Sequence, residues 1–186
     1  MLELLIAQSA IIHACPGSDI EGQCTTTQIG EAIVTAYHCV RRCAPDDWRG
    51  SEALDIVIIQ EGEVTDEDCV DAAVGDVVTA SGWPNTGYEQ MTGTVMGIHN
   101  TRRLNPEGIY EYKLVYDVSF EVLLGYSGGP LTHKDGSRSV GVNYSSGVSG
   151  SSSLTVSTAC AFIRGEYDAL NLELQSRTTK SVQSPQ

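Results

Sequence analysis

The sequence has little positive charge and lacks any long apolar run. Lys and Arg together number 11 against 24 Asp and Glu in 186 residues, which gives a formal net charge of −13. A chain this acidic repels a phosphate backbone, so nucleic acid is excluded as an expected partner. No apolar run approaches the roughly 18 residues of a membrane-spanning helix, so we expect no membrane span.

Phenylalanine and tryptophan are also scarce, with two of each, whereas glycine is abundant, with 19 residues. Hydrophobic residues make up 41% and charged residues 19%, as in a folded globular protein. The length suits one domain of ordinary size or two small fused lobes. Together with many Thr, Val and Ser residues, the glycines favour short strands joined by frequent turns.

The six cysteines form no Cys-x-x-Cys pair, which disfavours a zinc site. Their even number predicts three disulfides and an oxidising compartment, so we expect a secreted or extracytoplasmic protein. Free thiols in an intracellular or viral protein are one alternative, and a metal site using Cys39, Cys43, Cys69 and a histidine is another. We expect no metal and no cofactor. Residues 1–14 are apolar-leaning, but Glu3 stands where a signal peptide would carry positive charge. We therefore interpret them as a terminal segment leading into the first strand, with a signal-peptide remnant as the alternative. The cysteines lie at positions 15, 24, 39, 43, 69 and 160.

The strand-like segments fall into two runs, separated by a segment in which six of the eleven residues 61–71 are acidic. Apolar residues at 163, 167, 170 and 174 then recur at the period of a helix. We predict an all-β protein of two six-stranded antiparallel Greek-key barrels, with a cleft between them and a C-terminal helix. The predicted units are an N-terminal barrel over 9–62, an acidic linker over 63–74, a C-terminal barrel over 75–162 whose last strand spans 154–162, a helix over 163–176 and a disordered tail over 177–186.

Three residues have the chemistry of a nucleophilic site. Ser127 lies in the segment 125–131 (GYSGGPL), whose glycines permit a tight turn with an exposed hydroxyl and inward-pointing N–H groups. His38 follows an apolar strand-like segment, and Asp55 precedes a β-branched run. A hydroxyl needs a base to take its proton, and that base needs an acceptor to fix its tautomer. A glycine-rich turn, a structural histidine and a carboxylate at a loop rim are the alternatives.

Three short segments carry a resemblance to a known family. Residues 35–39 (TAYHC), 54–58 (LDIVI) and 125–131 resemble the histidine, aspartate and serine segments of chymotrypsin-like (trypsin-like) serine proteases. Two further segments resemble the Deg-type branch of this family: residues 75–84 (GDVVTASGWP), and an Asp-Gly turn followed by 141–143 (GVN). The sequence as a whole is closer to bacterial and viral members than to digestive ones. The resemblance covers about residues 10–170 and implies a serine endopeptidase acting on protein or peptide substrates.

The resemblance also implies roles for individual residues. Ser127 would be the nucleophile, His38 the general base and Asp55 the carboxylate that orients it. The backbone N–H groups of Gly125 and Ser127 would form the oxyanion hole. A disulfide would join Cys24 to Cys39.

Substrate would bind as an extended strand along Asn143, Tyr144 and Ser145. Glu121 would lie at the base of the S1 pocket and favour Arg or Lys at P1. The apolar residues 122–124 and the Deg-type resemblance instead predict an aliphatic pocket, with Glu121 turned to solvent. We favour the basic pocket slightly and expect a monomer.

Two departures from the family pattern leave alternatives open. Tyr126 stands where digestive proteases have an aspartate that pairs with a freed N-terminus, so we expect a site that forms without processing. Only 17 positions separate His38 from Asp55, which is short for the family. The acid could therefore be Asp46 or Asp47, and the chain could be an inactive binding or regulatory protein. A viral or phage polyprotein-processing protease is a further alternative with the same chemistry.

Overall fold

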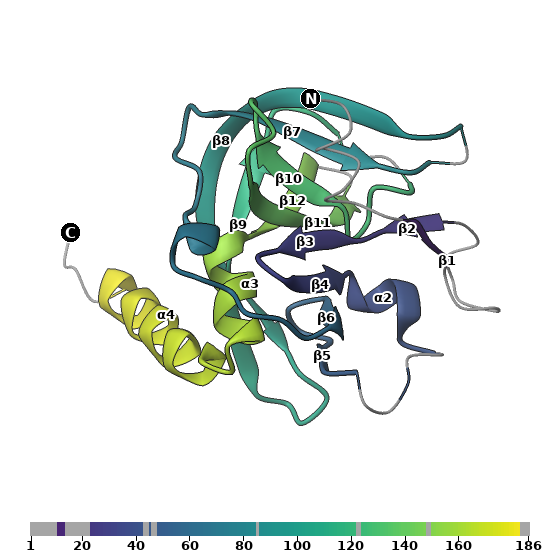
Figure 1. Cartoon of the computed structure of the whole chain (residues 1–186). Helices are drawn as coiled ribbons and strands as arrows, with labels where there is room; N and C mark the ends of the chain where they lie inside the picture. The colour runs from purple at the N-terminus through teal and green to yellow at the C-terminus, as the bar shows by residue number, and fades with distance from the viewer. Residues whose placement is uncertain are drawn as a thin grey trace.

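The computed structural model describes residues 11–13, 23–42, 45, 48–84, 86–121, 124–147 and 150–182. Its strands form a C-terminal lobe and a smaller N-terminal lobe, with two helices at the end of the chain (Figure 1). None of the described helices is both long enough and apolar enough to cross a membrane. Cys15 and Cys43, and the alternative acids Asp46 and Asp47, lie outside the described residues.

The C-terminal lobe is a closed antiparallel barrel of six strands in the order β10-β11-β12-β9-β8-β7. Its interior is filled by apolar side chains that include Val78, Val95, Tyr116, Leu131 and Val140. One of the two predicted barrels is therefore present. Its strands are β7 (Val77–Gly82), β8 (Glu89–Leu104), β9 (Tyr110–Val118), β10 (Pro130–His133), β11 (Ser139–Gly147) and β12 (Gly150–Thr155).

The N-terminal lobe differs from the predicted closed barrel of six strands. In the part of the chain that the structure describes, it has a four-stranded sheet in the order β3-β4-β6-β5 and a separate β1-β2 hairpin. The short path from His38 to Asp55 explains the difference, because its described residues form a one-turn helix, α2 (Tyr37–Val40), and a two-residue strand. The strands are β1 (Ile11–His13), β2 (Gln23–Thr25), β3 (Thr27–Ile29), β4 (Ala32–Thr35), β5 (Gly50–Ser51) and β6 (Ile56–Gln60).

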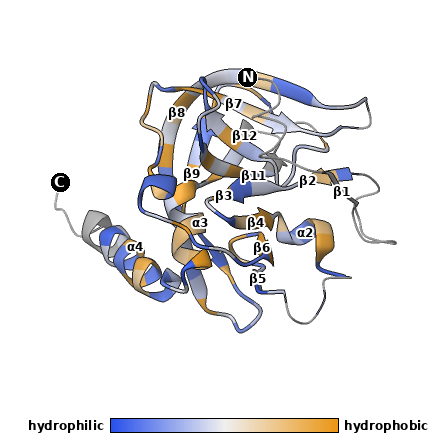
Figure 2. Cartoon of the chain, in the orientation of Figure 1, coloured by the Kyte–Doolittle hydropathy of each residue, from blue (hydrophilic) through white to orange (hydrophobic). Residues whose placement is uncertain are grey.

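A helix completes the core of the N-terminal lobe. Buried residues of β3, β4 and β6 pack against α3 (Val156–Ile163) in one apolar cluster that also contains Tyr167. In Figure 2 much of the α3 ribbon has the colour of hydrophobic residues, whereas the coloured part of α4 (Tyr167–Val182) alternates between hydrophilic and hydrophobic. The N-terminal sheet is therefore covered mainly by α3, with Val142 of β11 and Leu154 of β12 in the same cluster.

The predicted last strand over 154–162 is wrong, because β12 ends at Thr155 and α3 begins at the next residue. The Thr155 side chain accepts a hydrogen bond from the Thr158 N–H, and Asp71 accepts bonds from the N–H and hydroxyl of Ser157 at 2.9 and 2.6 Å. These oxygens satisfy the free N–H groups of a first helical turn. Helix α4 begins at Tyr167, four residues later than predicted, and extends to Val182, into the predicted tail.

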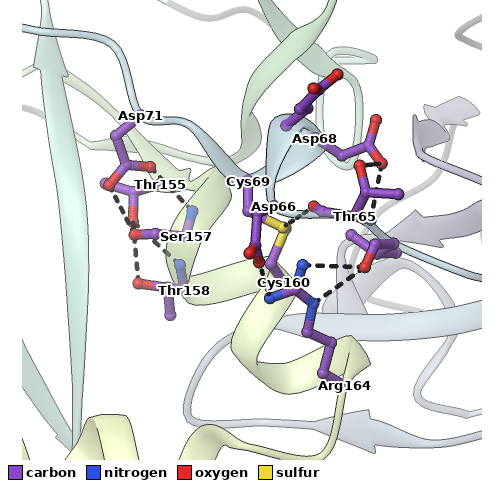
Figure 3. The surroundings of a disulfide bond; sticks show 12 residues. Thr65, Asp66, Asp68, Cys69, Asp71, Thr155, Ser157, Thr158, Cys160 and Arg164 are labelled. Carbon is purple, nitrogen blue, oxygen red and sulfur yellow. Dashed lines mark hydrogen bonds and ion pairs between the residues drawn. A yellow bond between two sulfur atoms is a disulfide. The ribbon is translucent and has the colours of Figure 1, made fainter.

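The acidic segment between the lobes is attached to α3 rather than free in solvent. Its short 3-10 helix, η1 (Glu67–Cys69), carries a disulfide from Cys69 to Cys160 (Figure 3). The Arg164 guanidinium donates to the Val64 carbonyl at 3.0 and 3.1 Å and lies 2.9 Å from Asp66. The predicted linker is thus a second layer over α3.

The β8-β9 hairpin is long enough to reach the N-terminal lobe. In Figure 1 it extends from the barrel down to the level of β5. Near its tip Arg103 donates to the Glu52 carbonyl at 3.3 Å, and Ser51 bonds Glu111 at 3.4 Å. From the other side, Arg49 donates to the carbonyls at 162 and 163, at the C-terminus of α3, at 2.6 Å each. The two lobes are therefore tied together by polar contacts.

Candidate active site

The imidazole of His38 is held at the end of a buried strand. Strand β4 is buried along three of its four residues, and the chain turns at Ala36 into α2, which carries His38 in its first turn. A disulfide joins Cys39, the next residue, to Cys24 on β2. This pairing confirms the predicted disulfide. It braces the backbone on which the imidazole stands.

Asp55 binds His38 twice. Its Oδ2 lies 2.6 Å from the imidazole Nδ1, and its Oδ1 accepts the backbone N–H of His38 at 2.8 Å. The side chains are 23% and 11% exposed, so the pair is largely shielded from water. A carboxylate at Nδ1 favours the tautomer with the proton on that nitrogen, which leaves Nε2 free to accept a proton.

The backbone at Asp55 adopts a left-handed conformation. Among the described residues it is the only non-glycine residue with a positive φ, at 57°. Such a conformation costs an ordinary residue about 1–2 kcal/mol, and Asp and Asn adopt it more readily than most. This conformation accompanies the geometry in which one carboxylate reaches both the Nδ1 atom and the backbone nitrogen of His38.

The serine loop lies against the strand end that leads to His38. Gly128 has a φ of +80°, and a Cβ placed on it would lie 2.1 Å from the Thr35 hydroxyl and 2.7 Å from the Ala36 nitrogen. Only a residue without a side chain permits this approach. The backbone of residues 127–128 and the start of the histidine helix are thereby brought together.

A group of buried threonines holds the serine loop to the N-terminal lobe. The Thr25 N–H donates to the Ser127 carbonyl at 2.8 Å, and the Thr25 hydroxyl donates to the Gly125 carbonyl at 2.7 Å. The Thr27 hydroxyl donates to the Gly128 carbonyl at 2.7 Å. The sequence indicates these threonines only as strand formers, and nothing in their spacing predicts that they join the two lobes.

The predicted oxyanion donors are not used elsewhere. Gly125 has a φ of +95°, and its carbonyl accepts from the Trp83 N–H at 3.3 Å as well as from Thr25. Over the described part of the chain, neither the Gly125 nor the Ser127 N–H donates a hydrogen bond. Among the described residues, the Ser127 hydroxyl and the His38 imidazole form no hydrogen bond with each other.

Tyr126 holds the loop by packing. Its ring is fully buried, and a Cβ on Gly82 would lie 2.6 Å from the Tyr126 Cγ. Burial, with a contribution from the nearby Glu89 carboxylate, raises the pKa of the Tyr126 phenol to about 12. Within the described chain its hydroxyl and the Trp83 indole N–H are buried without partners. No charge of Tyr126 supports the loop at neutral pH.

The predicted substrate-binding residues have different surroundings. Glu121 is exposed. Asn143 is fully buried, and its side chain binds Pro130 and Ser153. Its N–H and carbonyl bond to the serine loop at 2.9 and 2.6 Å, so Asn143 has no main-chain group left for a substrate. Ser145 lies on β11, and its side chain is outside the described part.

Tyr144 lines a cavity of about 260 Å³ beside the His38–Asp55 pair. Sequence reasoning missed the charged residues that share this cavity or lie behind it. The cavity is lined by Tyr37, His38, Arg41, Glu52, Asp55, Arg103 and Tyr144. Behind it, Lys113 of β9 is 5% exposed, and its ammonium lies 4.1 Å from the centre of the Tyr144 ring. The alternation of polar and apolar residues in β9 gives no signal that this lysine is buried.

The alternative metal site is wrong. Cys39 and Cys69 are each part of a disulfide, and a disulfide sulfur is not a thiolate ligand. Cys24, His38 and Cys39 do place ligand atoms within 4.8 Å of one another. Because two of these atoms are the sulfurs of one disulfide, this group does not offer a metal centre.

Comparison with solved structures identifies the fold as chymotrypsin-like. The chain is similar to the active form of the Rv3671c protease from M. tuberculosis, with a TM-score of 0.59 and 16% identity over 85% of this chain and 80% of that one. It is also similar to the inactive form of Rv3671c protease (TM-score 0.57, 18% identity, 87% and 91% covered) and to Deg5 (0.54, 20%, 86% and 90%). No protein-family model matches the sequence, and no curated protein matches it. The predicted resemblance to trypsin-like proteases of the Deg type is confirmed at the level of the fold.

Proposed function

We propose that the protein is a serine endopeptidase that cleaves peptide bonds through an acyl-enzyme intermediate. Ser127 attacks the scissile carbonyl, His38 takes its proton and returns it to the leaving amine, and Asp55 holds the imidazole. The observation that carries the proposal is the pair of hydrogen bonds between Asp55 and His38, to Nδ1 at 2.6 Å and from the backbone N–H at 2.8 Å, which orient both the ring and the backbone of the base. The unused N–H groups of Gly125 and Ser127 support their role as oxyanion donors.

The substrate is proposed to bind as an extended strand beside β11. Strand β10 pairs with β11 only as far as Val142, whereas β12 pairs with β11 to Gly147. The edge of β11 that lies beyond Val142 therefore has main-chain groups that an extended peptide could pair with. Tyr144 and Ser145 begin this edge. The exposure of Glu121 favours an aliphatic over a basic P1 pocket.

The two disulfides, Cys24–Cys39 and Cys69–Cys160, fit an extracytoplasmic location for this activity. We propose that the protein acts there as a monomer on protein or peptide substrates. A polyprotein-processing protease would use the same residues in the same roles and would differ only in its substrate.

Labelling with a fluorophosphonate probe tests the assignment. The wild type should be labelled, and Ser127→Ala and His38→Ala should lose labelling while keeping their circular dichroism. His99→Ala is the matched control, because His99 also pairs with a carboxylate, Asp117, at 2.7 Å, but both side chains are more than half exposed. Equal labelling of wild type and Ser127→Ala would refute the nucleophile assignment. Digestion of a peptide library by wild type and Glu121→Gln would measure the P1 preference.

A protease-fold binding protein is the second candidate. The missing hydrogen bond between Ser127 and His38 favours it. If this candidate is correct, a folded wild type would bind extended peptides and would not react with the probe. Calorimetric titration of the protein with peptides that it does not cleave measures this binding. Together with the labelling experiment, it separates the two functions.

A further inference from the structure

A buried lysine, Lys113, lies beside the backbone that leads into Asp55. The Lys113 side chain comes from β9, and its ammonium donates to the carbonyl of Leu54, the residue before Asp55, at 3.4 Å. The same Nζ atom lies over the Tyr144 ring, 4.1 Å from the ring centroid. Burial lowers the pKa of Lys113 to about 8, and the Asp55 carboxylate partly opposes this effect. The lysine thus remains mostly protonated at neutral pH.

Burying an ammonium is costly unless an opposite charge or a hydrogen-bond acceptor compensates it. Here the compensation comes from the carbonyl of Leu54, the face of Tyr144 and the carboxylate of Asp55. Two further cations, Arg41 and Arg103, line the cavity beside Asp55, but both are exposed, and Arg103 lies 3.7 Å from Glu52, so solvent screens them. Lys113 faces the Tyr144 ring and the charges of Asp55 and Arg103. The charged and titratable groups that line the cavity with Asp55 are His38, Tyr37 and Arg41 of the α2 region, Glu52 of the turn after β5, Arg103 of β8 and Tyr144 of β11.

We propose that Lys113 is a positioning residue of this site, whose buried ammonium supplies the positive charge that keeps Asp55 ionised while His38 is neutral. The proposal rests on the proposed protease function. A general base must be neutral to accept a proton. With Lys113 present, the group of Lys113, Asp55 and neutral His38 carries no net charge. Without Lys113 the same state leaves a largely buried anion that keeps its hydrogen bonds to His38 but loses its buried cation, and His38 then holds its proton to higher pH.

The tests use variants that separate charge from packing. Lys113→Met keeps the apolar stem, Lys113→Gln keeps a polar end without charge, and Lys113→Arg keeps the charge. Lys134→Met is the matched control, because Lys134 is an exposed lysine in the β10-β11 turn. Each variant is made in the wild type and in the Ser127→Ala background.

Imidazole NMR titration in the Ser127→Ala background measures His38 without relying on activity. The midpoint should rise by about half a pH unit or more in Lys113→Met and Lys113→Gln, and stay unchanged in Lys134→Met. Lys113→Arg should restore the wild-type midpoint. In the catalytic background the acidic limb of the labelling profile should move to higher pH by the same amount, so that labelling below the midpoint slows about threefold.

An unchanged His38 midpoint in both neutral variants would overturn the role of Lys113. An unchanged midpoint with slower labelling at every pH would assign Lys113 to packing alone, which also overturns the proposal. If the wild type is not labelled but the NMR midpoint rises as expected, the protease assignment fails and the charge compensation stands. The two failures are therefore distinguishable.

Discussion

Removing the charge of Lys113 should make the protein more stable at neutral pH. Burial lowers its pKa from an ordinary 10.5 to about 8, so the folded state binds this proton more weakly than the unfolded state does. The two values differ by about 2.5, which at about 1.36 kcal/mol per pKa unit is a cost of about 3 kcal/mol below pH 8. The value of about 8 already includes the attraction of Asp55, so removing the charge recovers this cost, less the hydrogen bond to the Leu54 carbonyl that Lys113→Met also loses. We expect a net gain of about 1–3 kcal/mol at pH 7.

The pH dependence of this gain identifies its cause. As the pH rises from 8 to 10.5, Lys113 loses its proton in the folded protein before it does so in the unfolded chain, so wild-type stability rises relative to Lys113→Met. Urea unfolding of both proteins at pH 7 and pH 10 measures the difference, in which groups other than Lys113 and His38 cancel, and the NMR titration supplies the contribution of His38. Lys134→Met should show no such pH-dependent difference. A Lys113→Met protein that is less stable than wild type at both pH values would refute the reasoning.

Three further predictions concern other parts of the structure. Asp55→Asn keeps a residue type that tolerates the left-handed backbone and should slow probe labelling about 10³–10⁴-fold without unfolding, as labelling kinetics and circular dichroism would show. Gly128→Ala should lose about 2–4 kcal/mol in urea unfolding, whereas Gly108→Ala, with the same φ of +80° but no neighbour within 4 Å, should lose only about 1 kcal/mol; equal losses would contradict the close approach. Replacing Cys69 and Cys160 by Ala should cost about 2–4 kcal/mol in urea unfolding, and an unchanged midpoint would contradict the attachment of the acidic segment to α3.

Local signals allowed much of the site to be predicted. The expectation of short strands rich in β-branched and aromatic residues is met by β4 and β9, in which such residues dominate. The Cys24–Cys39 disulfide and the contact of His38 with Asp55 follow the resemblance of short motifs. The short spacing between His38 and Asp55 does not prevent this contact. The backbone at Asp55 is left-handed, and the carboxylate reaches the imidazole in this conformation.

The remaining features depend on contacts between distant residues. Residues 156–163 have a Val, Ser and Thr content typical of a strand, yet they form α3 because Asp71, 86 positions earlier, binds its first turn. The burial of Lys113 depends on Leu54, in the turn before β6, and on Tyr144 of β11. No window of sequence contains these partners, so propensity and periodicity could not predict them.

The position of α3 has a consequence for the order in which the protein folds. The sheet of the N-terminal lobe is synthesised first, but its core is closed by side chains of α3 that follow about a hundred residues later. The Arg49 guanidinium likewise finds its carbonyl partners at 162 and 163. We therefore expect the N-terminal lobe to remain incompletely folded during synthesis, and His38 and Asp55 to reach their final positions only after the C-terminal barrel has been made.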